Sequence, residues 1–520
     1  MSLFKPYSYK QGAALSIGST FIWKMLSFVN SILIAFYFGT RANCDVYFYI
    51  LFIVGLAALF FTSLNSNVII PQAIYLKKEN EKTAQNFLNF VLLLYITILL
   101  LILLAGMLFP VGIFSIISKF SIDILSQDIL ILRLAFLYTC TYILCYFILD
   151  IMYIYHIFSI NFLFPLNALL PMLIMLLLHK TLGIKTMLIG FIISYFIQII
   201  TCLFIMKKKL NWSFTHIKTT LESRLKNNII TNQMLVVIDS IVSLLPFYLM
   251  SSFTGGIISA LSYAKQLTDS PSEILTLKIT QVFHIQLNEN ASAKDFDALN
   301  ENYLKVNYLL LFIMIPLAIF TCYFAPDIVN LFFKRGEFNE ESAQNVVKFL
   351  RPLMIWLITG MLAPFAASLI ASTRKIKESF KYMLFKNIII FAVMYFSIYH
   401  FGPFAFPYAQ IGCSLFAYFV VVLFFKKHIP QIKFWLPLKD AVILSCLNLL
   451  ALIPAAFIGG NLQEQNSFIR IFICGLIFLF TLALLYIPTK QFKKILPFIL
   501  GAKYQTFTNK LPLTLKKFFI

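Results

Sequence analysis

Long runs of apolar residues, separated by short polar breaks, follow one another along most of the chain. Crossing a hydrocarbon core of about 30 Å takes about 20 helical residues, and the runs reach that length. They predict about fourteen membrane-spanning helices, near residues 12–38, 45–71, 86–110, 128–155, 158–179, 184–206, 228–252, 255–285, 303–327, 341–371, 379–400, 404–425, 437–459 and 466–488. The runs are continuously apolar and lack the alternation of barrel strands, so helices are predicted rather than a β-barrel.

The composition excludes a soluble protein. Hydrophobic residues make up 60% of the 520 residues and charged residues only 12%, with a mean hydropathy of +0.86. A soluble domain carries about 25% charged residues, so this chain has too few polar side chains to cover a water-facing surface. The predicted fold class is an all-α polytopic membrane protein.

The basic residues are distributed unevenly over the loops. Lys and Arg number 42 against 21 Asp and Glu, a net charge of +21, which in a soluble protein would suggest nucleic acid. Here the cations cluster in loops on the side of the N-terminus, in segments 77–82, 207–226, 374–381, 426–427 and 489–520. The positive-inside rule therefore places both termini in the cytoplasm, and the charge predicts attraction to anionic membrane lipid rather than to nucleic acid.

The two ends of the chain carry further signals. Residues 1–10 lead directly into a span-length run, which is not the pattern of a cleavable signal peptide. The tail after residue 489 alternates basic with apolar residues. It is either an interfacial helix on anionic lipid or a solvated anchor.

The sequence contains no recognisable catalytic site. GxSxG, Walker A and HExxH motifs are missing from it, and most of the eight cysteines lie in apolar runs without metal-ligand spacing. We therefore expect no enzyme, no resident metal and no self-contained ATP-driven pump. A secondary transporter, a channel and a membrane scaffold remain.

An internal repeat divides the predicted helices. The turn at residues 38–47 resembles the turn at 253–263, roughly 215 positions later, and six spans intervene. This spacing indicates two parallel six-helix lobes. The predicted organisation is an N-lobe (1–206), a basic cytoplasmic linker (207–227), a C-lobe (228–430), two C-terminal helices (431–488) and the basic tail (489–520).

Several ionisable residues fall inside predicted spans. Lys24 and Asp239 lie mid-way in the first and seventh spans at matching places, and Asp150 and Arg351 are further candidates. The eighth span carries a polar stripe, in which the charged residues are Lys265, Asp269, Glu273, Lys278 and His284. Charges at bilayer depth mark a functional site by default, but internal ion pairs between helices would explain them equally.

Three collinear segments resemble the lipid II flippase (MurJ/MviN) family of the multidrug/oligosaccharidyl-lipid/polysaccharide (MOP) exporter superfamily. Residues 331–338, LFFKRGEF, resemble the family's LFxRGxF signature; 233–240, QMLVVIDS, resemble QxNxxxDT; and 263–275, YAKQLTDSPSEIL, resemble YADRLxxxPSGxLG. The resemblance implies two lobes around a charged cavity that alternately faces each side of a bacterial cytoplasmic membrane. It implies a monomer that moves an undecaprenyl-pyrophosphate-linked glycan for cell-wall synthesis, with cell-wall or polysaccharide biosynthesis proteins as candidate partners.

The resemblance also implies cavity residues, and the sequence departs from some of them. The two arginines of the family's first helix fall at Lys24 and Asn30, and the arginine of the YADR motif falls at Gln266. Lys265 and Lys278 offer replacement cations, although lysine lacks the bidentate fork that suits pyrophosphate. These departures leave open a surface-polysaccharide repeat unit as cargo, a cation-coupled drug exporter, or a transport-inactive scaffold.

The resemblance further implies a sodium site in the second lobe. Asp239 and Asn387 match two of its ligands, Ser414 is a candidate hydroxyl ligand, and Phe391 stands where an acidic residue is expected. Asp239 could equally carry a proton, its pKa raised by burial, form a structural ion pair, or contact the substrate. The coupling ion is therefore Na⁺ or H⁺.

The loop at Arg335 and Gly336 follows the ninth span on the non-cytoplasmic side. As a gate, Arg335 would pair with the outer rim of the other lobe while the cavity faces inward. As a simple turn, Gly336 supplies an unusual backbone angle and nearby glutamates neutralise the charge. Both interpretations remain open from the sequence.

Overall fold

The computed structural model describes residues 9–214, 223–253, 255–292, 295–363, 365–366, 369–370 and 375–489. Every regular element in these residues is helical, as the sequence predicts. The chain forms two compact units, which are residues 1–262 with 335–339, and residues 263–334 with 340–520. The expected boundary at the basic linker 207–227 falls partly on residues that lie outside the described ones, as does the tail from 490, so both stay predictions.

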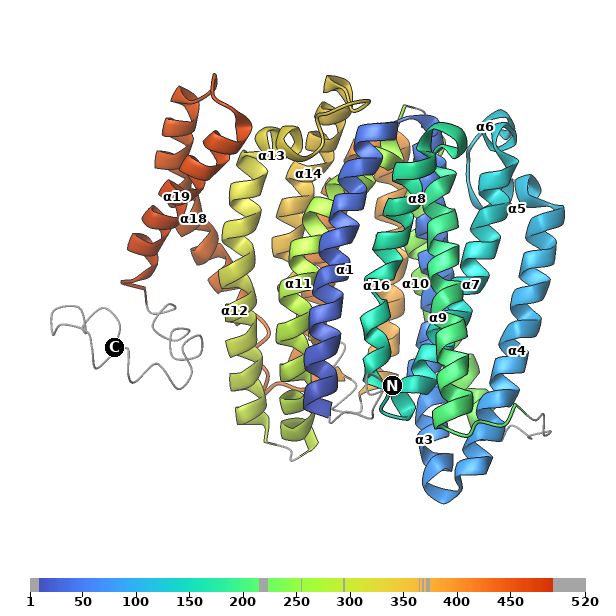
Figure 1. Ribbon diagram of the computed structural model, residues 1–520. Coiled ribbons are helices and arrows are strands. Elements are labelled where there is room, and N and C mark those ends of the chain that lie inside the picture. Colours follow the sequence, from blue (N-terminus) through green and yellow to red (C-terminus); the bar gives the residue numbers. More distant parts are fainter. Residues whose placement is uncertain are drawn as a thin grey trace. The chain divides into compact units, whose positions relative to one another are not determined.

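The first unit contains ten α-helices that begin and end within it and the first turns of an eleventh (Figure 1). These are α1 (Tyr9–Phe38), α2 (Ala42–Leu64), α3 (Ile70–Glu79), α4 (Glu81–Leu108), α5 (Pro110–Ile117), α6 (Ile122–Gln127), α7 (Ile129–Ile154), α8 (Leu166–Leu182), α9 (Lys185–Lys209), α10 (Ser223–Met250) and the start of α11 (Ile257–Ser292). In this unit the α3–α4 turn lies at the same end as the N-terminus, and α5 and α6 lie at the opposite end (Figure 1). Helix α7 packs against α2, α4 and α9, and α8 packs against α1 and α9.

Helices α2 and α3 form one continuous rod through a π-helical turn, η1 (Asn65–Ile69). The rod runs from Ala42 to Glu79, well beyond the run predicted at 45–71. Pro71 lies in the first turn of α3 and has no N–H to donate to the preceding turn, which accords with the irregular hydrogen bonding of η1 just before it. A second irregular turn, the 3₁₀-helix η2 (Phe158–Leu163), precedes α8. Such π turns inside helices frequently mark functional sites.

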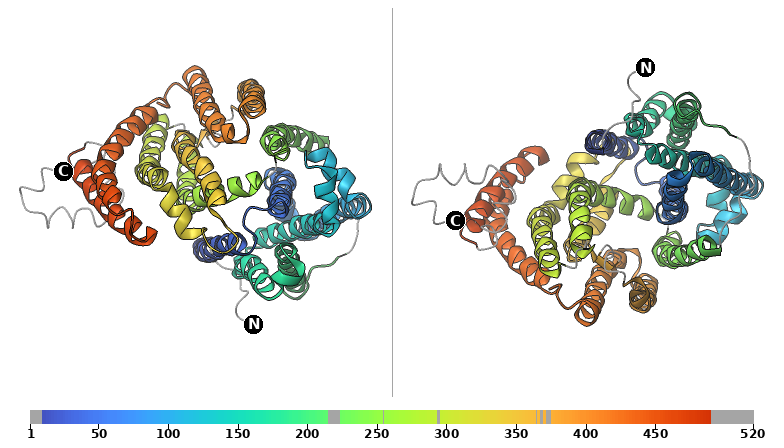
Figure 2. Two further views of the ribbon diagram at one scale, coloured as in Figure 1. Left: turned by 90° about the horizontal axis from the view of Figure 1, so that it is seen from above. Right: turned by 90° about the horizontal axis from the view of Figure 1, so that it is seen from below.

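The second unit holds the rest of α11 and the helices that follow it. These are α12 (Phe296–Tyr323), α13 (Ala325–Phe332), α14 (Glu340–Gly360), α16 (Ile376–Phe401), α17 (Phe406–His428), α18 (Leu436–Asn461) and α19 (Ser467–Tyr486), with a 3₁₀ turn η3 (Pro403–Ala405). Helices α18 and α19 lie side by side (Figure 2) and pack on α12 and α13. Their core includes Leu311, Phe324, Leu444, Cys474 and Phe478.

Twelve helices among the described residues are long and apolar enough to cross a membrane. They correspond to twelve of the predicted spans, and α11 and α14 occupy the other two positions as helices. The single helix predicted at 341–371 is interrupted: α14 ends at Gly360, a turn and bend follow at 361–363, and residues 366, 369 and 370 are helical again. Glycine and the proline at 364 both disfavour helix continuation there.

The apolar pattern does not predict the three short helices. Helices α5 and α6 occupy the stretch between two predicted spans, and α13 overlaps the end of the span predicted at 303–327. Each has only six to eight residues, too few for a periodic pattern. Local signals start them: Pro110 opens α5, and the Ser121 hydroxyl accepts a hydrogen bond from the Ile124 N–H to cap α6.

Candidate functional site

The Asp45 carboxylate links the start of α2 to the start of α11 within the first unit. It accepts hydrogen bonds from the Gly256 N–H (3.1 Å), the Ser259 N–H (2.7 Å) and the Ser259 hydroxyl (2.6 Å). The side chain is only 2% exposed. The first N–H groups of a helix have no intrahelical partner and carry its positive dipole end. Asp45 therefore caps α11 from another helix, through charge-assisted hydrogen bonds.

The loop 335–339 contacts the α1–α2 turn in the same unit. The Glu337 carboxylate forms an ion pair with the Arg41 guanidinium, and the Glu337 N–H donates to the Phe36 carbonyl at 2.9 Å. Both charged side chains are at least half exposed, so the ion pair contributes little by itself. The backbone hydrogen bond fixes the position of the loop.

Two glycines make these approaches sterically feasible. Gly336 has a φ of +59°, and a Cβ atom there would overlap the Phe36 carbonyl oxygen. Gly256 has a φ of +79°, and a Cβ atom there would overlap Thr40. Left-handed backbone and close backbone contact both require glycine. The unusual backbone angle predicted at Gly336 is confirmed. The pairing of Arg335 with the rim of the other lobe stays a prediction. The cation that pairs with Glu337 is Arg41.

Further contacts fasten α10 to α2 beside this site. The rings of Phe52 and Phe247 stack with centroids 3.7 Å apart. The Gln233 side chain donates to the Phe60 carbonyl at 3.0 Å. Directly after α10, the Ser251 hydroxyl accepts from the Lys119 N–H between α5 and α6 at 2.7 Å, which ties this end of α10 to a different part of the unit. One end of α2 is thus hydrogen-bonded to α11, and α2 contacts α10 at Phe52 and Phe60.

The two candidate cavity residues of α1 have different surroundings. Asn30 is 4% exposed and donates to the Ala168 carbonyl of α8 at 2.8 Å. Its amide therefore joins two helices, which argues against direct contact with a cargo molecule in this conformation. Lys24 is half-buried, with its amine 5.0 Å from the centroid of the Trp23 ring.

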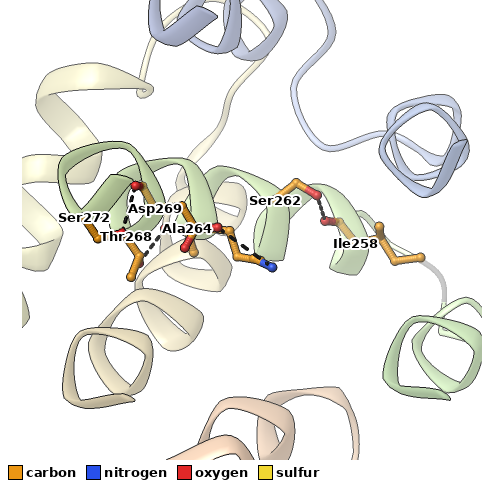
Figure 3. Close-up of polar contacts among 7 residues, drawn as sticks. Ile258, Ser262, Ala264, Thr268, Asp269 and Ser272 are labelled. Carbon is orange, nitrogen blue, oxygen red and sulfur yellow. Dashed lines mark hydrogen bonds and ion pairs between the residues drawn. The ribbon is translucent and has the colours of Figure 1, made fainter. Parts of the chain in front are cut away.

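Several polar side chains of α11 are bonded along their own helix (Figure 3). Thr268 donates to the Ala264 carbonyl at 3.0 Å, and Gln266 donates to Ser270 at 3.1 Å. Lys265 lies 3.9 Å from Asp269, and both side chains are more than a third exposed, so this pair is loose and weak. The side chains of Lys278 and His284 lie outside the described ones.

The candidate coupling residues fall on three helices. Asp239 is an exposed residue of α10 in the first unit. In the second unit, Asn387 of α16 is 7% exposed, and the Ser414 hydroxyl of α17 shares a hydrogen bond with Thr359 of α14. No cluster of three His, Cys, Asp or Glu residues suited to a metal ion occurs in the described part of the chain. The sodium site stays a prediction.

The sequence left open an ion pair for Asp150, but in the structure its partner is an uncharged amide. Its carboxylate accepts a hydrogen bond from the Asn65 amide at 2.8 Å, and Asn65 accepts one from the Tyr95 hydroxyl at 2.7 Å. No Lys or Arg contacts it among the described residues. Side-chain hydrogen bonds of this kind hold helices together in a membrane, so α2, α4 and α7 are joined at the π-helical turn.

Comparison with known proteins assigns the family. The chain matches the family described as "Lipid II flippase MurJ" over residues 34–482, which is most of its length. The chain belongs to the lipid II flippase MurJ family. This MurJ-family protein is therefore a multi-pass membrane transporter and not an enzyme. Lys24 and Asn30 precede the matched segment, whereas Asp45, Gly256 and Gly336 lie within it.

Named relatives of this MurJ-family protein agree with the assignment. A probable lipid II flippase MurJ of Borreliella burgdorferi is 23% identical over 432 residues, covering 80% of this chain and 83% of the relative. A structure of a lipid II flippase MurJ in an inward closed conformation has a TM-score of 0.72 at 19% identity, covering 91% of this chain and 99% of the other. An inward-facing multidrug MATE transporter of the MOP superfamily has a TM-score of 0.61 at 12% identity, covering 82% and 95%. The expected superfamily fold is confirmed.

Proposed function

We propose that this protein flips an undecaprenyl-pyrophosphate-linked glycan precursor, lipid II or a related lipid-linked oligosaccharide, across a bacterial cytoplasmic membrane. Both termini face the cytoplasm, and the protein works by alternating access with Na⁺ or H⁺ as coupling ion. The match to the MurJ family over residues 34–482 carries this proposal. A charged pyrophosphate cannot cross hydrocarbon unaided, because a buried charge without a partner is heavily penalised.

The contacts of Asp45 supply the outer closure in this mechanism. They join the start of α2 to the start of α11 at the end of the first unit that lies opposite the N-terminus (Figure 1). With the N-terminus in the cytoplasm, that end faces outward. A cavity that opens outward must break these hydrogen bonds, together with the contact of Glu337 with the α1–α2 turn. Cargo release therefore depends on how readily this cluster separates.

A surface-polysaccharide repeat unit is the second candidate cargo. Gln266 stands where the family resemblance expects a cavity arginine, and in this structure it is hydrogen-bonded to Ser270 of its own helix. Asn30 stands where another arginine is expected, and its amide donates a hydrogen bond to the Ala168 carbonyl. Arginine guanidinium groups bind a pyrophosphate through two parallel hydrogen bonds. With fewer of them in the cavity, the protein favours a cargo that is held more through its sugars than through its pyrophosphate.

Transport into sealed vesicles tests the function. Purified protein in liposomes that contain fluorescent lipid II should expose the label to an added membrane-impermeant quencher faster than empty liposomes do. Lys24→Ala should abolish this rate if Lys24 attracts the anionic head group, and Lys24→Arg should keep part of it. Lys180→Ala, an exposed position of α8 in the same unit that belongs to none of the candidate sites, controls for the loss of one lysine.

The outcomes separate the hypotheses. If the protein flips a polysaccharide precursor but does not flip lipid II, the surface-polysaccharide repeat unit is the cargo. Transport of cationic drugs with neither lipid would make the protein a drug exporter. If well-folded protein transports neither the two lipids nor the drugs, the protein is a transport-inactive membrane scaffold. Unchanged transport by Lys24→Ala would remove that residue from the cavity.

A further inference from the structure

A pocket lies at the ends of α16 and α17 in the second unit, apart from all the residues considered for cargo or coupling ion. It has a volume of about 650 Å³ and is lined by Glu378, Lys381, Tyr382, Phe385, Lys427 and His428. A volume of this size is in the range of about 300–1,000 Å³ that small-molecule sites occupy. The pocket is a shallow depression that is open to the surroundings of the protein.

The residues from α16 follow one face of the helix. Glu378, Lys381, Tyr382 and Phe385 are spaced at i, i+3, i+4 and i+7, which places them in one row. Charged groups come first, at the helix end, and the aromatic rings follow one turn deeper into the span, which runs from Glu378 to Phe401. The order is therefore cationic at the membrane surface and apolar below it.

Aromatic packing fixes the inner wall. The His428 ring stacks on Phe424 with centroids 4.8 Å apart and meets Tyr382 edge-on at 6.1 Å. Tyr382 in turn packs edge-on against Phe424 at 5.3 Å. The two helices are thus held together just behind the pocket, and its shape does not depend on long flexible side chains alone.

The pocket has an excess of positive charge. Glu378 is paired with Lys375 at 3.3 Å. Neither Lys381 nor Lys427 forms an ion pair with a carboxylate of the described residues, and both side chains are exposed. Two cations on different helices therefore border one concave space, and the single carboxylate beside them, Glu378, is already paired with Lys375.

Apolar exposure around the mouth indicates lipid rather than a soluble anion. Phe385 is 55% exposed, and Ile388, one turn further along α16, is 58% exposed. A soluble phosphate would gain nothing from these surfaces, whereas the glycerol and upper acyl chains of a phospholipid would cover them. Basic pockets between membrane helices on the cytoplasmic side are typical binding places for anionic lipid head groups.

We propose that this pocket binds the phosphate head group of one anionic phospholipid of the inner leaflet. Lys381 and Lys427 hold the phosphate between the two helices, while Tyr382 and Phe385 contact the glycerol region. A phosphate that bridges α16 and α17 stabilises the folded protein, since a ligand that binds only the native state raises its stability.

The test is a lipid titration of the purified full-length protein in a neutral detergent at low ionic strength. Phosphatidylglycerol should add a bound lipid in native mass spectrometry and raise the midpoint of thermal unfolding, whereas phosphatidylcholine and inorganic phosphate should do neither. In Lys381→Gln/Lys427→Gln the apparent affinity should fall about 30-fold, from about 1 kcal/mol for each cation near a phosphate and 1.4 kcal/mol per tenfold. Each single replacement should lose about fivefold, which keeps the test available if the double variant folds poorly.

Lys426→Gln is the matched control. Lys426 precedes Lys427 on α17 and is equally exposed, but it does not line the pocket. An equal loss in Lys426→Gln would mean diffuse attraction of the lipid to a basic surface and would overturn the site. An unchanged affinity in the double variant would do the same, and stabilisation by inorganic phosphate alone would replace the lipid with a soluble anion.

Discussion

Asp45 concentrates three hydrogen bonds on one buried carboxylate, and its two oxygen atoms serve different donors. One oxygen receives the N–H and hydroxyl of Ser259, and the other receives the N–H of Gly256. An amide in place of the carboxylate would point its NH₂ group at one of these donors. The contact between α2 and α11 therefore depends on the charge of residue 45 and on both of its oxygens.

Asp45→Asn should shift the protein toward outward opening. Losing the charge and one acceptor costs the closed state about 1–2 kcal/mol, so the open population rises about five- to thirty-fold. The rate at which an impermeant maleimide labels Ser262→Cys from outside, in a background without the exposed Cys446, measures this population. Asp123→Asn, an exposed acidic residue of α6, is the control, and equal labelling in both variants would contradict the role of Asp45.

Gly336→Ala should destabilise the contact of the 335–339 loop with α1. An L-residue in left-handed backbone costs about 1–2 kcal/mol, and here the added Cβ also overlaps the Phe36 carbonyl. Gly183→Ala is the comparison variant, because Gly183 also has a positive φ, +58°, but no atom lies near its Cβ position. Gly336→Ala should therefore lower the thermal unfolding midpoint more than Gly183→Ala does. Equal shifts would reduce the loop to an isolated turn.

Asp239→Asn should remove the stabilisation of the protein by sodium if Asp239 binds the coupling ion. Sodium at about a hundred times its dissociation constant would stabilise the wild type by about 2.7 kcal/mol. Thermal unfolding in sodium chloride and in choline chloride, at several pH values, measures the difference. Asn387→Ala should lose the same increment. A sodium-dependent shift that survives in Asp239→Asn assigns the residue another role.

Single residues were predictable from the sequence where a local rule applies. The backbone angle of Gly336 follows from a glycine in a tight loop, and that angle is observed. The partner of Asp150 was not predictable, because Asn65 and Tyr95 come from distant helices and meet it only after packing. The role of Asp45 had a weak signal in the sequence, since Asp45 lies in one of the two repeated turns and its partners lie in the other.

At the scale of elements, the long helices were the predictable part. Continuous apolar runs set their places, because the length of a span is fixed by the thickness of the bilayer. Short helices such as α5 and α13, and the π-helical turn within the α2–α3 rod, depend on caps and tertiary contacts. The hydropathy of the sequence carries no information about them.

Helix α19 offers a test of one such tertiary contact. The Arg470 guanidinium donates to Asp327 of α13 at 2.8 Å and to the Gly459 carbonyl of α18 at 2.9 Å, and the two charged side chains are 20% and 11% exposed. Arg470→Met should destabilise the protein by about 3–5 kcal/mol, because it leaves a largely buried carboxylate without a partner.

The double variant Arg470→Met/Asp327→Leu should recover most of that loss, since two apolar side chains can replace a buried pair. Thermal unfolding of the single and double variants forms a double-mutant cycle. Strictly additive losses would mean that the pair does not hold α13 to α19.

At the scale of the whole molecule, the distribution of lysine and arginine predicts the orientation. Glu79→Cys, at the end of α3, should be protected from an impermeant maleimide in intact cells, and Gln465→Cys, between α18 and α19, should react. Both positions are exposed. The measurement is labelling before and after the cells are opened, and the reverse pattern would invert the proposed direction of transport.

In the proposed transport cycle, the cap that Asp45 places on α11 sets the free energy that outward opening has to overcome. When the contact opens, the carboxylate and its three donors form hydrogen bonds with water instead. Each hydrogen bond therefore stabilises the closed state by only about 1.5–3 kcal/mol net. The whole contact is then comparable with the roughly 5.5 kcal/mol that moves a two-state equilibrium from 1:99 to 99:1. Binding of a single cargo molecule or ion supplies free energy of that order. In that cycle, the binding of a cargo molecule or of a coupling ion is enough to shift the equilibrium between the closed and the open state in either direction.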